Sequence, residues 1–336
     1  MVNEAHEKDM VVILDWVANH TGFIYSWTEI EGYHNTDSSG QVTWPKNTDW
    51  TDVADLNYDN REMRQKMIDE MKWWIIETDI DGFRCDVAGE VPDDFWTVAI
   101  DSLTSYKDIF MLAEWDEPKM HQNGFHMTYG WGPHHWMNSA AKGEINIDSL
   151  EALMLSDIER YSLSDFRMMF TTNHDENSWN GTVFERFGEG HQAWAAWAFT
   201  VRGMPLNYSG QEAGLDKRLK FFEKDTIAWS SIQYQDFYSQ LLKLKHDNRA
   251  LYNGAYGGDL TFAKDDNSSV STFVRRKGDN AVVGIVNLSS KKQIVKISAK
   301  GLDTEARDWM TGDLVRIKTG EQLPLAPFQY YIFSID

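Results

Sequence analysis

The sequence predicts an α/β fold over most of its length and an all-β domain at its end. Two observations support this. Short apolar runs alternate with amphipathic helical segments up to about residue 250, a pattern typical of a parallel sheet with right-handed helical crossovers. After Gly257, segments of period-two alternation are separated by Asp, Asn and Gly turns, which favours an antiparallel β-sandwich. We therefore predict two domains, residues 1–252 and 253–336.

Composition limits the classes of partner. The 52 Asp and Glu against 32 Lys and Arg give a net charge of −20, so we expect no nucleic acid and no anionic membrane as partner. The single cysteine, Cys85, excludes an intrachain disulfide and a cysteine-built zinc site. The 15 Trp residues suit a core and also flat platforms for sugar rings. No apolar run has the length of a membrane span, and the polar start MVNEAHEKDM is not a signal peptide.

The first elements can be placed from apolar patterns. The run VVILD (11–15) ends in Asp and fits a parallel strand that is buried on both faces. Residues 22–58 are rich in Gly, Asn, Asp and Thr, and this stretch is long enough to favour a functional insertion. Met and Trp side chains at helical spacing predict a core-packed helix over 60–78, and a short buried strand follows at 81–86.

The same patterns continue beyond this strand. Further helices are predicted near 93–103, 147–161, 191–202 and 234–247, and further strands near 109–114, 125–128, 167–172 and 204–208. These bring the parallel strands to about six. Residues 116–146 otherwise read as irregular, and the His-rich GPHHW within them (132–136) is expected to be loop structure rather than a metal site.

The strand DGFRCD carries the first chemical signal. Phe83 and Cys85 alternate with Arg84 and Asp86, so Arg84 and Asp86 point to the same side. A guanidinium favours an ionised carboxylate and lowers its pKa, which suits a carboxylate nucleophile. On these residues alone a purely structural ion pair remains the simpler interpretation.

Acidic residues follow several of the predicted strands, and this pattern favours a functional role for Asp86 over a purely structural ion pair. Asp86, Glu114 and Asp175 stand at three strand ends, which form the catalytic face of a (β/α)8 barrel and the ligand edge of a doubly wound sheet. No Gly-rich phosphate loop is present, so a nucleotide-binding fold is disfavoured. Retaining glycoside cleavage needs an ionised carboxylate and a protonated acid about 5–5.5 Å apart. Asp86 suits the first role, and Glu114, between the apolar IFMLA and Trp115, suits the second.

Four motifs in this order resemble the α-amylase family, glycoside hydrolase family 13: DWVANH (15–20), DGFRCDVAG (81–89), AEW (113–115) and TTNHDEN (171–177). The resemblance implies a (β/α)8 TIM-type barrel with a short inserted domain at 22–58, and a C-terminal domain like that of the family. It implies that Asp86 is the nucleophile, Glu114 the acid/base and Asp175 the transition-state stabiliser. The residues that it implies for substrate binding are Arg84, His20, His174 and Trp115.

The resemblance also implies a structural Ca²⁺ held by Asn19 and Asp55, and no organic cofactor. Two donors are fewer than the 6–8 oxygens that Ca²⁺ takes. Glu90 and Gly89 stand where many members have His and Lys. The alternative for Asn19 is a loop-capping side chain, and for the two histidines of the motifs it is a hydrogen-bonded core position.

The DWVANH motif belongs to the family's third barrel strand, so two βα units have no counterpart. We therefore expect an N-terminally truncated member with an incomplete barrel, which a missing segment or a homodimer would complete. The expected activity is α-amylase-type hydrolysis of α-1,4-glucosidic bonds in starch or maltodextrins. The alternatives are a neopullulanase-like enzyme or 4-α-glucanotransferase of the same family, or a catalytically dead fragment that at most binds glucan.

Overall fold

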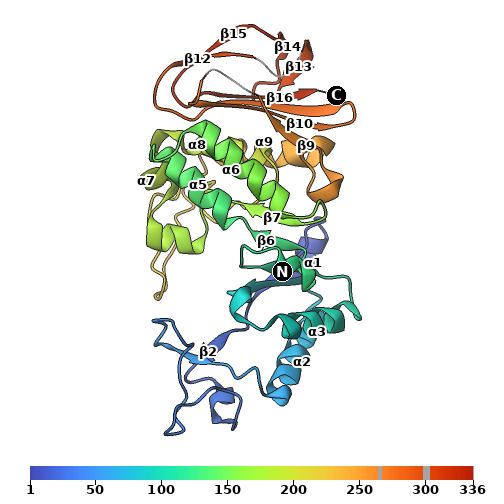
Figure 1. Ribbon diagram of the computed structural model, residues 1–336, viewed down its shortest axis with the longest axis vertical. Coiled ribbons are helices and arrows are strands. Elements are labelled where there is room, and N and C mark those ends of the chain that lie inside the picture. The colour runs from blue at the N-terminus through green and yellow to red at the C-terminus, as the bar shows by residue number, and fades with distance from the viewer. Residues whose placement is uncertain (264–266, 298–302, 336) are drawn as a thin grey trace. The chain divides into compact units, whose positions relative to one another are not determined.

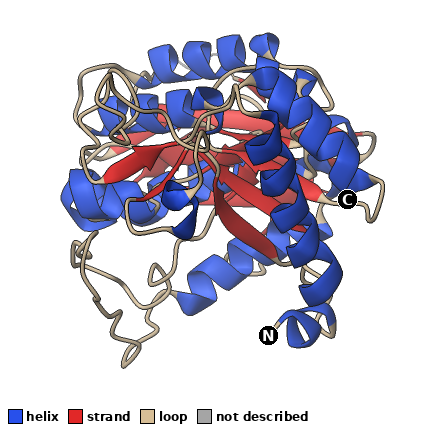
Figure 2. Cartoon of the chain, turned by 90° about the horizontal axis from the view of Figure 1, so that it is seen from below, coloured by secondary structure: helices blue, strands red, loops and turns tan. Residues whose placement is uncertain are grey.

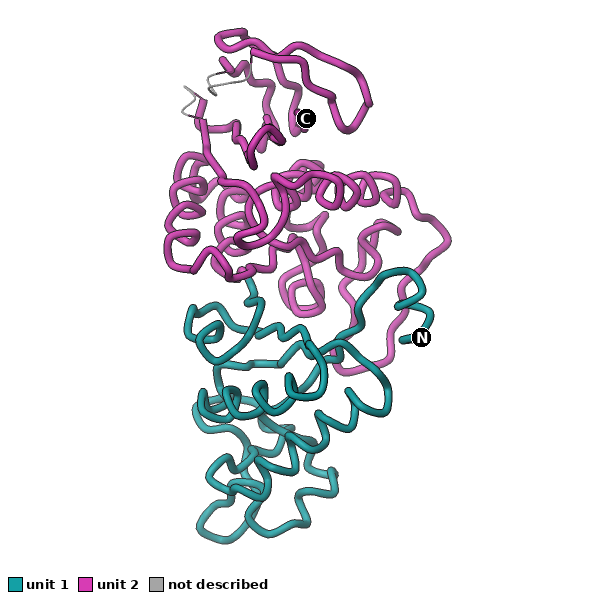
Figure 3. Tube along the Cα trace, turned by 90° about the vertical axis from the view of Figure 1, so that its right-hand side faces the viewer, with its two compact units in different colours: residues 1–129 teal, residues 130–336 magenta. Residues whose placement is uncertain are grey.

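A computed structural model describes residues 1–263, 267–297 and 303–335 (Figure 1). The chain divides into two compact units, residues 1–129 and 130–336 (Figure 3). No helix of the described residues is long and apolar enough to cross a membrane.

Unit 1 is built on four parallel strands with helices between them. In chain order its elements are α1 (Val2–His6), β1 (Ile13–Val17), β2 (His20–Gly22), the 3₁₀-helix η1 (Ser26–Glu29), β3 (Val53–Asp55), α2 (Arg61–Thr78), β4 (Gly82–Asp86), η2 (Ala88–Glu90), α3 (Asp93–Thr104), β5 (Phe110–Ala113), α4 (Lys119–Gln122) and β6 (Met127–Tyr129). The parallel pairs are β1 with β4, β4 with β5, and β5 with β6. Between β1 and α2, the insertion holds only the short hairpin β2–β3, η1 and turns, as its composition predicts.

The helix α2 shows how local sequence sets the ends of an element. The Asn60 side chain caps its start by accepting hydrogen bonds from the backbone N–H groups of Glu62 and Met63, at 2.9 and 3.1 Å. Its Met stripe is buried, as the helical spacing predicts, and packs in one core with the apolar residues of β4 and α3. The helix ends at Asp79, whose φ of 58° is the left-handed conformation common after helices.

Unit 2 continues the alternation of helices and strands. Its first elements are α5 (Trp131–Ala141), α6 (Ile147–Arg160), β7 (Phe166–Met169), the π-helix η3 (Glu176–Asn180), α7 (Val183–Phe187), η4 (Gly188–Gly190), α8 (His191–Thr200), β8 (Met204–Pro205), α9 (Gln235–Asp247), η5 (Arg249–Leu251) and η6 (Gly254–Tyr256). Strands β7 and β8 are parallel. The described residues thus contain six parallel strands, four in unit 1 and two in unit 2, as predicted; Figure 2 shows strands in red and helices in blue.

The chain ends in two antiparallel sheets. The larger has the order β14-β13-β16-β11-β10-β9 and the smaller pairs β12 with β15. The bounds are β9 (Asp259–Phe262), β10 (Val270–Lys277), β11 (Asn280–Asn287), β12 (Gln293–Lys296), β13 (Thr304–Asp308), β14 (Leu314–Ile317), β15 (Gln322–Leu325) and β16 (Tyr330–Ile335). The predicted all-β domain is confirmed.

The centre of the large sheet is buried on both faces, and β11 shows why. Val282 and Val286 pack with α8 and α9 in one core, whereas Val283 and Ile285 pack with the small sheet in another. Successive side chains of a strand point to opposite faces, so an all-apolar strand fits only between two layers. In Figure 1 the large sheet lies directly against α8 and α6.

Four points of the sequence analysis differ from the structure or are not tested by it. The segment GPHHW is part of helix α5, not a loop, because Trp131, His134 and Met137 at helical spacing face buried surroundings that its Gly and Pro conceal. Strands β13, β14 and β15 were not predicted, since each has only four or five residues. Two of the period-two segments after Gly257, LTFAKDD (260–266) and KQIVKISA (292–299), end at residues that lie outside the described part of the chain. The domain boundary at 252/253 stays a prediction.

Candidate active site

Arg84 is the centre of a polar cluster in unit 1. Its side chain is 8% exposed. Its Nη1 donates hydrogen bonds to Asp86 Oδ1 at 2.7 Å and to Asp15 Oδ1 at 2.8 Å. Its Nη2 lies 2.9 Å from Glu114 Oε1, and its Nε donates to the Tyr129 hydroxyl at 3.1 Å. One guanidinium therefore holds three carboxylates, including both residues predicted for acid–base and nucleophilic roles.

Strand register brings these residues together. Asp15 is the partner of Arg84 in the β1–β4 pair, and Cys85 is the partner of Ala113 in the β4–β5 pair. Glu114 therefore leaves β5 level with the end of β4, where its backbone N–H donates to the Cys85 carbonyl at 2.9 Å. Because parallel strands share their direction, their carboxyl ends collect these side chains on one edge.

Burial and neighbouring charges have opposite effects on the pKa of Arg84. Burial by itself lowers the pKa of a guanidinium, but the neighbouring Tyr129, Glu114 and Asp15 outweigh it and raise the pKa of Arg84 above its ordinary value. The guanidinium is thus a permanent cation among its partners.

Glu114 has polar rather than apolar surroundings. The prediction places its carboxyl in an apolar environment, and the side chain is indeed only 10% exposed. Yet Oε1 faces Arg84 and Oε2 accepts a hydrogen bond from the backbone N–H of Val87 at 2.8 Å. Val87 has φ 35° and ψ 47°, a left-handed conformation that is rare for a β-branched residue. Such strain clusters at functional sites, and here it turns a backbone donor toward the acid.

His20 lies at the same edge. It begins β2, opposite Asp55 of β3, and its ring meets the Trp50 ring edge-on at 5.8 Å. Burial lowers the pKa of His20, and the charge of Asp86 opposes this effect. His20 is therefore close enough to Asp86 to interact with its charge, as expected for a residue beside the reacting group.

Trp115 packs against the backbone at Gly89. A Cβ at position 89 would lie 2.0 Å from Cε2 of the indole, so no other residue fits there without displacing Trp115. This explains why glycine occupies the position where many family members have lysine. Among the described residues, the buried Nε1 of Trp115 has no hydrogen-bond partner.

The two predicted calcium ligands, Asn19 and Asp55, make other polar contacts. Asn19 and Asp55 lie on adjacent segments, but Asp55 Oδ2 accepts a hydrogen bond from Asn35 Nδ2 at 2.7 Å and Asn19 Nδ2 lies 3.3 Å from His20 Nδ1. Across the part of the chain that the structure describes, no group of three or more His, Cys, Asp or Glu side chains could hold a metal ion. Asn19 and Asp55 would supply two of the 6–8 oxygens that Ca²⁺ takes, so the calcium site stays a prediction.

Unit 2 presents the third predicted carboxylate. Asp175 follows β7 and immediately precedes the π-helix η3, and its Oδ2 lies 3.5 Å from His174 Nε2. Burial, together with the charge of Asp175, raises the pKa of Tyr208, which follows β8. His174, Asp175 and Tyr208 therefore form a local polar group at the carboxyl ends of β7 and β8. Short π-helices are frequent at functional sites.

A buried contact between a histidine and a carboxylate fixes the start of η3. Glu176 Oε2 lies 2.9 Å from His134 Nε2, and Asn180 donates to Oε1 at 2.9 Å. Burial alone would raise the pKa of Glu176, but the hydrogen bond and charge of His134 lower it to about 2. His134 in turn lies 3.0 Å from the Phe170 carbonyl. These contacts are structural and secure the residue next to Asp175.

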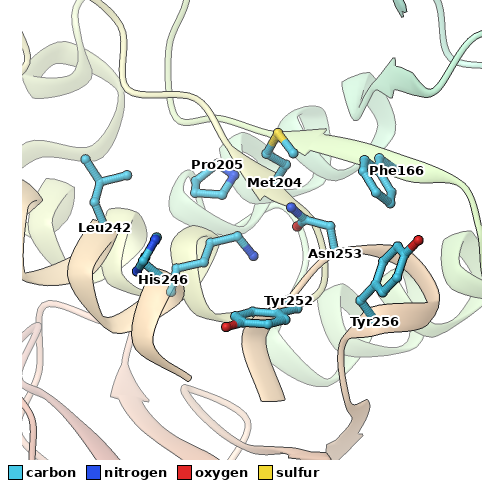
Figure 4. Close-up of a pocket in the computed structure, with 9 residues that line it drawn as sticks. Phe166, Met204, Pro205, Leu242, His246, Tyr252, Asn253 and Tyr256 are labelled. Carbon is cyan, nitrogen blue, oxygen red and sulfur yellow. The ribbon is translucent and has the colours of Figure 1, made fainter. Parts of the chain in front are cut away.

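A separate cavity of about 480 Å³ lies at the amino ends of β7 and β8 (Figure 4). Phe166 and Met204, the first residues of β7 and β8, line it together with Tyr252 and Tyr256. It contains none of the predicted site residues.

Sequence reasoning missed Tyr129 and Val87. Tyr129 ends β6, so the rule that selected the carboxylates, a polar group at the end of a parallel strand, could have found it. The role of Val87 depends on a backbone conformation that no side-chain pattern reveals.

The sequence model of the alpha-amylase catalytic domain matches residues 40–250. The alpha-amylase MalA of Haloarcula japonica is 27% identical over 93% of this chain and 47% of that protein. A cyclomaltodextrin glucanotransferase of Niallia circulans is 25% identical over 85% of this chain and 44% of that protein. The chain thus spans about half the length of these curated relatives.

Solved structures share the fold. The maltogenic alpha-amylase AmyB of Thermotoga neapolitana has a TM-score of 0.87 and 26% identity, over 99% of this chain and 79% of that one. An alpha-amylase of Lactobacillus plantarum has a TM-score of 0.86 and 24% identity, over 100% of this chain and 80% of that one.

Proposed function

This chain belongs to the alpha-amylase family, and from that premise we propose that it is a retaining glycoside hydrolase that cleaves α-1,4-glucosidic bonds of starch or maltodextrins. The observation that carries the proposal is the Arg84 cluster, in which two nitrogens of one guanidinium bind Asp86 and Glu114. Two carboxylates that share a guanidinium are close enough to act on one glycosidic bond, and retaining cleavage requires such a pair.

In the proposed reaction, a carboxylate oxygen of Asp86 attacks the anomeric carbon while Glu114 gives its proton to the departing glycosidic oxygen. A covalent glycosyl ester forms and the aglycone sugar leaves. Glu114 then takes a proton from water, whose oxygen attacks the anomeric carbon and releases Asp86. Arg84 holds Asp86 in place through the hydrogen bond from Nη1 to Oδ1. On the motif resemblance, we assign to Asp175 the stabilisation of the oxocarbenium-like transition state.

Substrate contacts are proposed for His20, Trp115 and His174, and α-glucan is the proposed partner. The position of His20 beside Asp86 supports one of these assignments. A structural Ca²⁺ at Asn19 and Asp55 gains no support from the contacts of those residues, and no step of the reaction depends on it.

A second activity, transfer of a glucan to another sugar, is favoured by the similarity to cyclomaltodextrin glucanotransferases. The two activities share the first step and differ in whether water or a sugar hydroxyl attacks the covalent intermediate. Elongation of maltotriose into longer sugars would identify the transferase.

The test is release of reducing sugar from soluble starch by the purified chain and by Asp86→Asn. Asp94→Asn is the matched control, since Asp94 is also an aspartate paired with an arginine, Arg64 at 2.7 Å, but on the surface. We expect activity in the unmutated chain and in the control, and its loss in Asp86→Asn. Starch binding with no sugar release in any of the three would instead support a glucan-binding protein without turnover.

A further inference from the structure

The cavity at the amino ends of β7 and β8 contains an amine that the proposed function does not use. Lys245 of α9 lines this cavity and is only 9% exposed. Most of the other wall residues are apolar or aromatic, among them Phe166, Met204, Tyr252 and Tyr256 (Figure 4). Tyr252 is 38% exposed and Tyr256 is 73% exposed, so solvent and small molecules reach the cavity past these rings.

Lys245 lacks the counter-ion that a lysine usually has. Its Nζ donates a hydrogen bond to the Leu251 carbonyl at 2.5 Å. Among the described residues, no carboxylate lies within ion-pair distance of this nitrogen. Lys243, two residues earlier on the same helix, is instead 68% exposed and pairs with Asp247. Because a buried charge without a counter-ion is costly, burial at Lys245 favours the neutral amine.

A second basic side chain adds to this effect. Arg275 is 1% exposed, and its Nη2 donates to the Tyr252 carbonyl at 3.3 Å. Two basic side chains therefore bind the carbonyls of consecutive residues, Leu251 and Tyr252. Burial and, secondly, the charge of Arg275 lower the pKa of Lys245 to about 7. Desolvation in an apolar pocket and a neighbouring cation are two conditions that activate a lysine amine as a nucleophile toward carbonyl compounds.

The cavity also offers a hydrogen-bond acceptor that the described residues leave unused. Asn253 lines the cavity, and its buried Oδ1 has no hydrogen-bond partner among the residues that the structure describes. Figure 4 shows Asn253 among the rings of Phe166, Tyr252 and Tyr256. Buried acceptors are ordinarily hydrogen-bonded, so a ligand hydroxyl group is the expected partner. Aromatic walls, one acceptor and one neutral amine together suit an aromatic aldehyde that carries a hydroxyl group.

We propose that Lys245 is a modification site, at which its amine forms an imine with a hydroxylated aromatic aldehyde bound in this cavity. The amine lone pair attacks the carbonyl carbon, the carbonyl oxygen takes up a proton and the nitrogen gives one up. The carbinolamine then loses water, so that a C=N bond replaces the C=O bond without oxidation or reduction. When protonated, the imine keeps one N–H for the Leu251 carbonyl. The inference is independent of the proposed function, because the cavity contains none of the residues assigned to glycoside cleavage.

The test is reductive labelling of the unmutated chain at pH 7 with 4-hydroxybenzaldehyde and sodium cyanoborohydride, which converts an imine to a stable secondary amine. Peptide mapping by mass spectrometry gives the rate of labelling at each lysine. Lys243 is the matched control within the same helix. The competitor is 4-methylphenol, which has the ring and the hydroxyl group but no aldehyde, and glucose serves as a polar aldehyde for comparison.

We expect Lys245 to be labelled at least about tenfold faster than Lys243. The reason is that an amine with a pKa of about 7 is largely neutral at pH 7, whereas an ordinary lysine is almost fully protonated. Labelling of Lys245 should saturate with aldehyde concentration and fall when 4-methylphenol is added, and glucose should show no preference for Lys245. Equal rates at Lys245 and Lys243, absence of competition, or preferential labelling of Lys245 by glucose would overturn the site.

Asn253→Ala tests the contact with the hydroxyl group. In the unmutated chain 4-hydroxybenzaldehyde should label Lys245 faster than benzaldehyde does, and this preference should be lost in the variant. The urea unfolding midpoint shows whether the variant is folded, and the comparison of Lys245 with Lys243 in the unmutated chain does not depend on it. A preference that persists in the folded variant would overturn the role of Asn253.

Discussion

Replacing Arg84 tests whether one guanidinium organises the site. Arg84→Met keeps much of the aliphatic stem but leaves Asp86 and the 10%-exposed Glu114 facing each other without a cation. Removing one partner of a buried ion pair typically costs about 3–5 kcal/mol of unfolding free energy. The pair with Asp15, whose side chain is 59% exposed, contributes at most about 1 kcal/mol of this.

Arg84→Lys separates charge from geometry. An ammonium is a compact charge and cannot reproduce the fork that binds Asp86, Glu114 and Tyr129 at once. We expect a smaller loss of unfolding free energy than in Arg84→Met, about 1–3 kcal/mol for the charged hydrogen bonds lost. Because misplacement of a reacting group by about 1 Å can reduce a rate a hundredfold, starch hydrolysis should fall by about that factor in both variants.

Urea unfolding monitored by Trp fluorescence gives the free energies, and reducing-sugar release from starch gives the rates. Arg64→Met serves as the control, because Arg64 pairs with Asp94, whose side chain is 70% exposed. Its free energy of unfolding should therefore stay much closer to that of the unmutated chain. If Arg84→Met unfolded at the same urea concentration as the unmutated chain and kept its activity, the guanidinium would not be the organising group.

Val87→Gly should leave the unfolding free energy within about 1 kcal/mol of the unmutated chain, because relief of the strained φ of 35° offsets the greater backbone entropy of glycine in the unfolded state. Starch hydrolysis should fall in this variant as the turn loosens. A loss of several kcal/mol in urea unfolding would show that the turn is unstrained. Gly89→Ala should cost about 1–3 kcal/mol in urea unfolding and shift the fluorescence of the displaced Trp115, whereas Gly22→Ala, with open space at its Cβ, should do neither. Burial lowers the pKa of His191 from 6.5 to about 4, so the folded state stays neutral where the unfolded state binds a proton. The free energy of unfolding should therefore be full above pH 6.5 and fall toward pH 4, and it should fall more in the unmutated chain than in His191→Gln. Urea unfolding at pH 7 and at pH 5 measures this change, and an equal change in both proteins would contradict the reasoning.

The sequence alone determined the alternation of helices and parallel strands, and it determined that Arg84 and Asp86 share a face. Both follow from local periodicity: two residues per repeat in a strand and 3.6 in a helix. The same local rule placed Glu114 at a strand end. It failed at GPHHW, where helix packing against Phe170 outweighs the Gly and Pro that suggest a loop.

Only the tertiary structure decided which of these groups meet. The register of β1, β4 and β5 brings Asp15 and Glu114 to the same guanidinium, and the left-handed turn at Val87 supplies a backbone donor. Register and loop conformation arise from non-local contacts, which a repeating pattern of side chains does not encode.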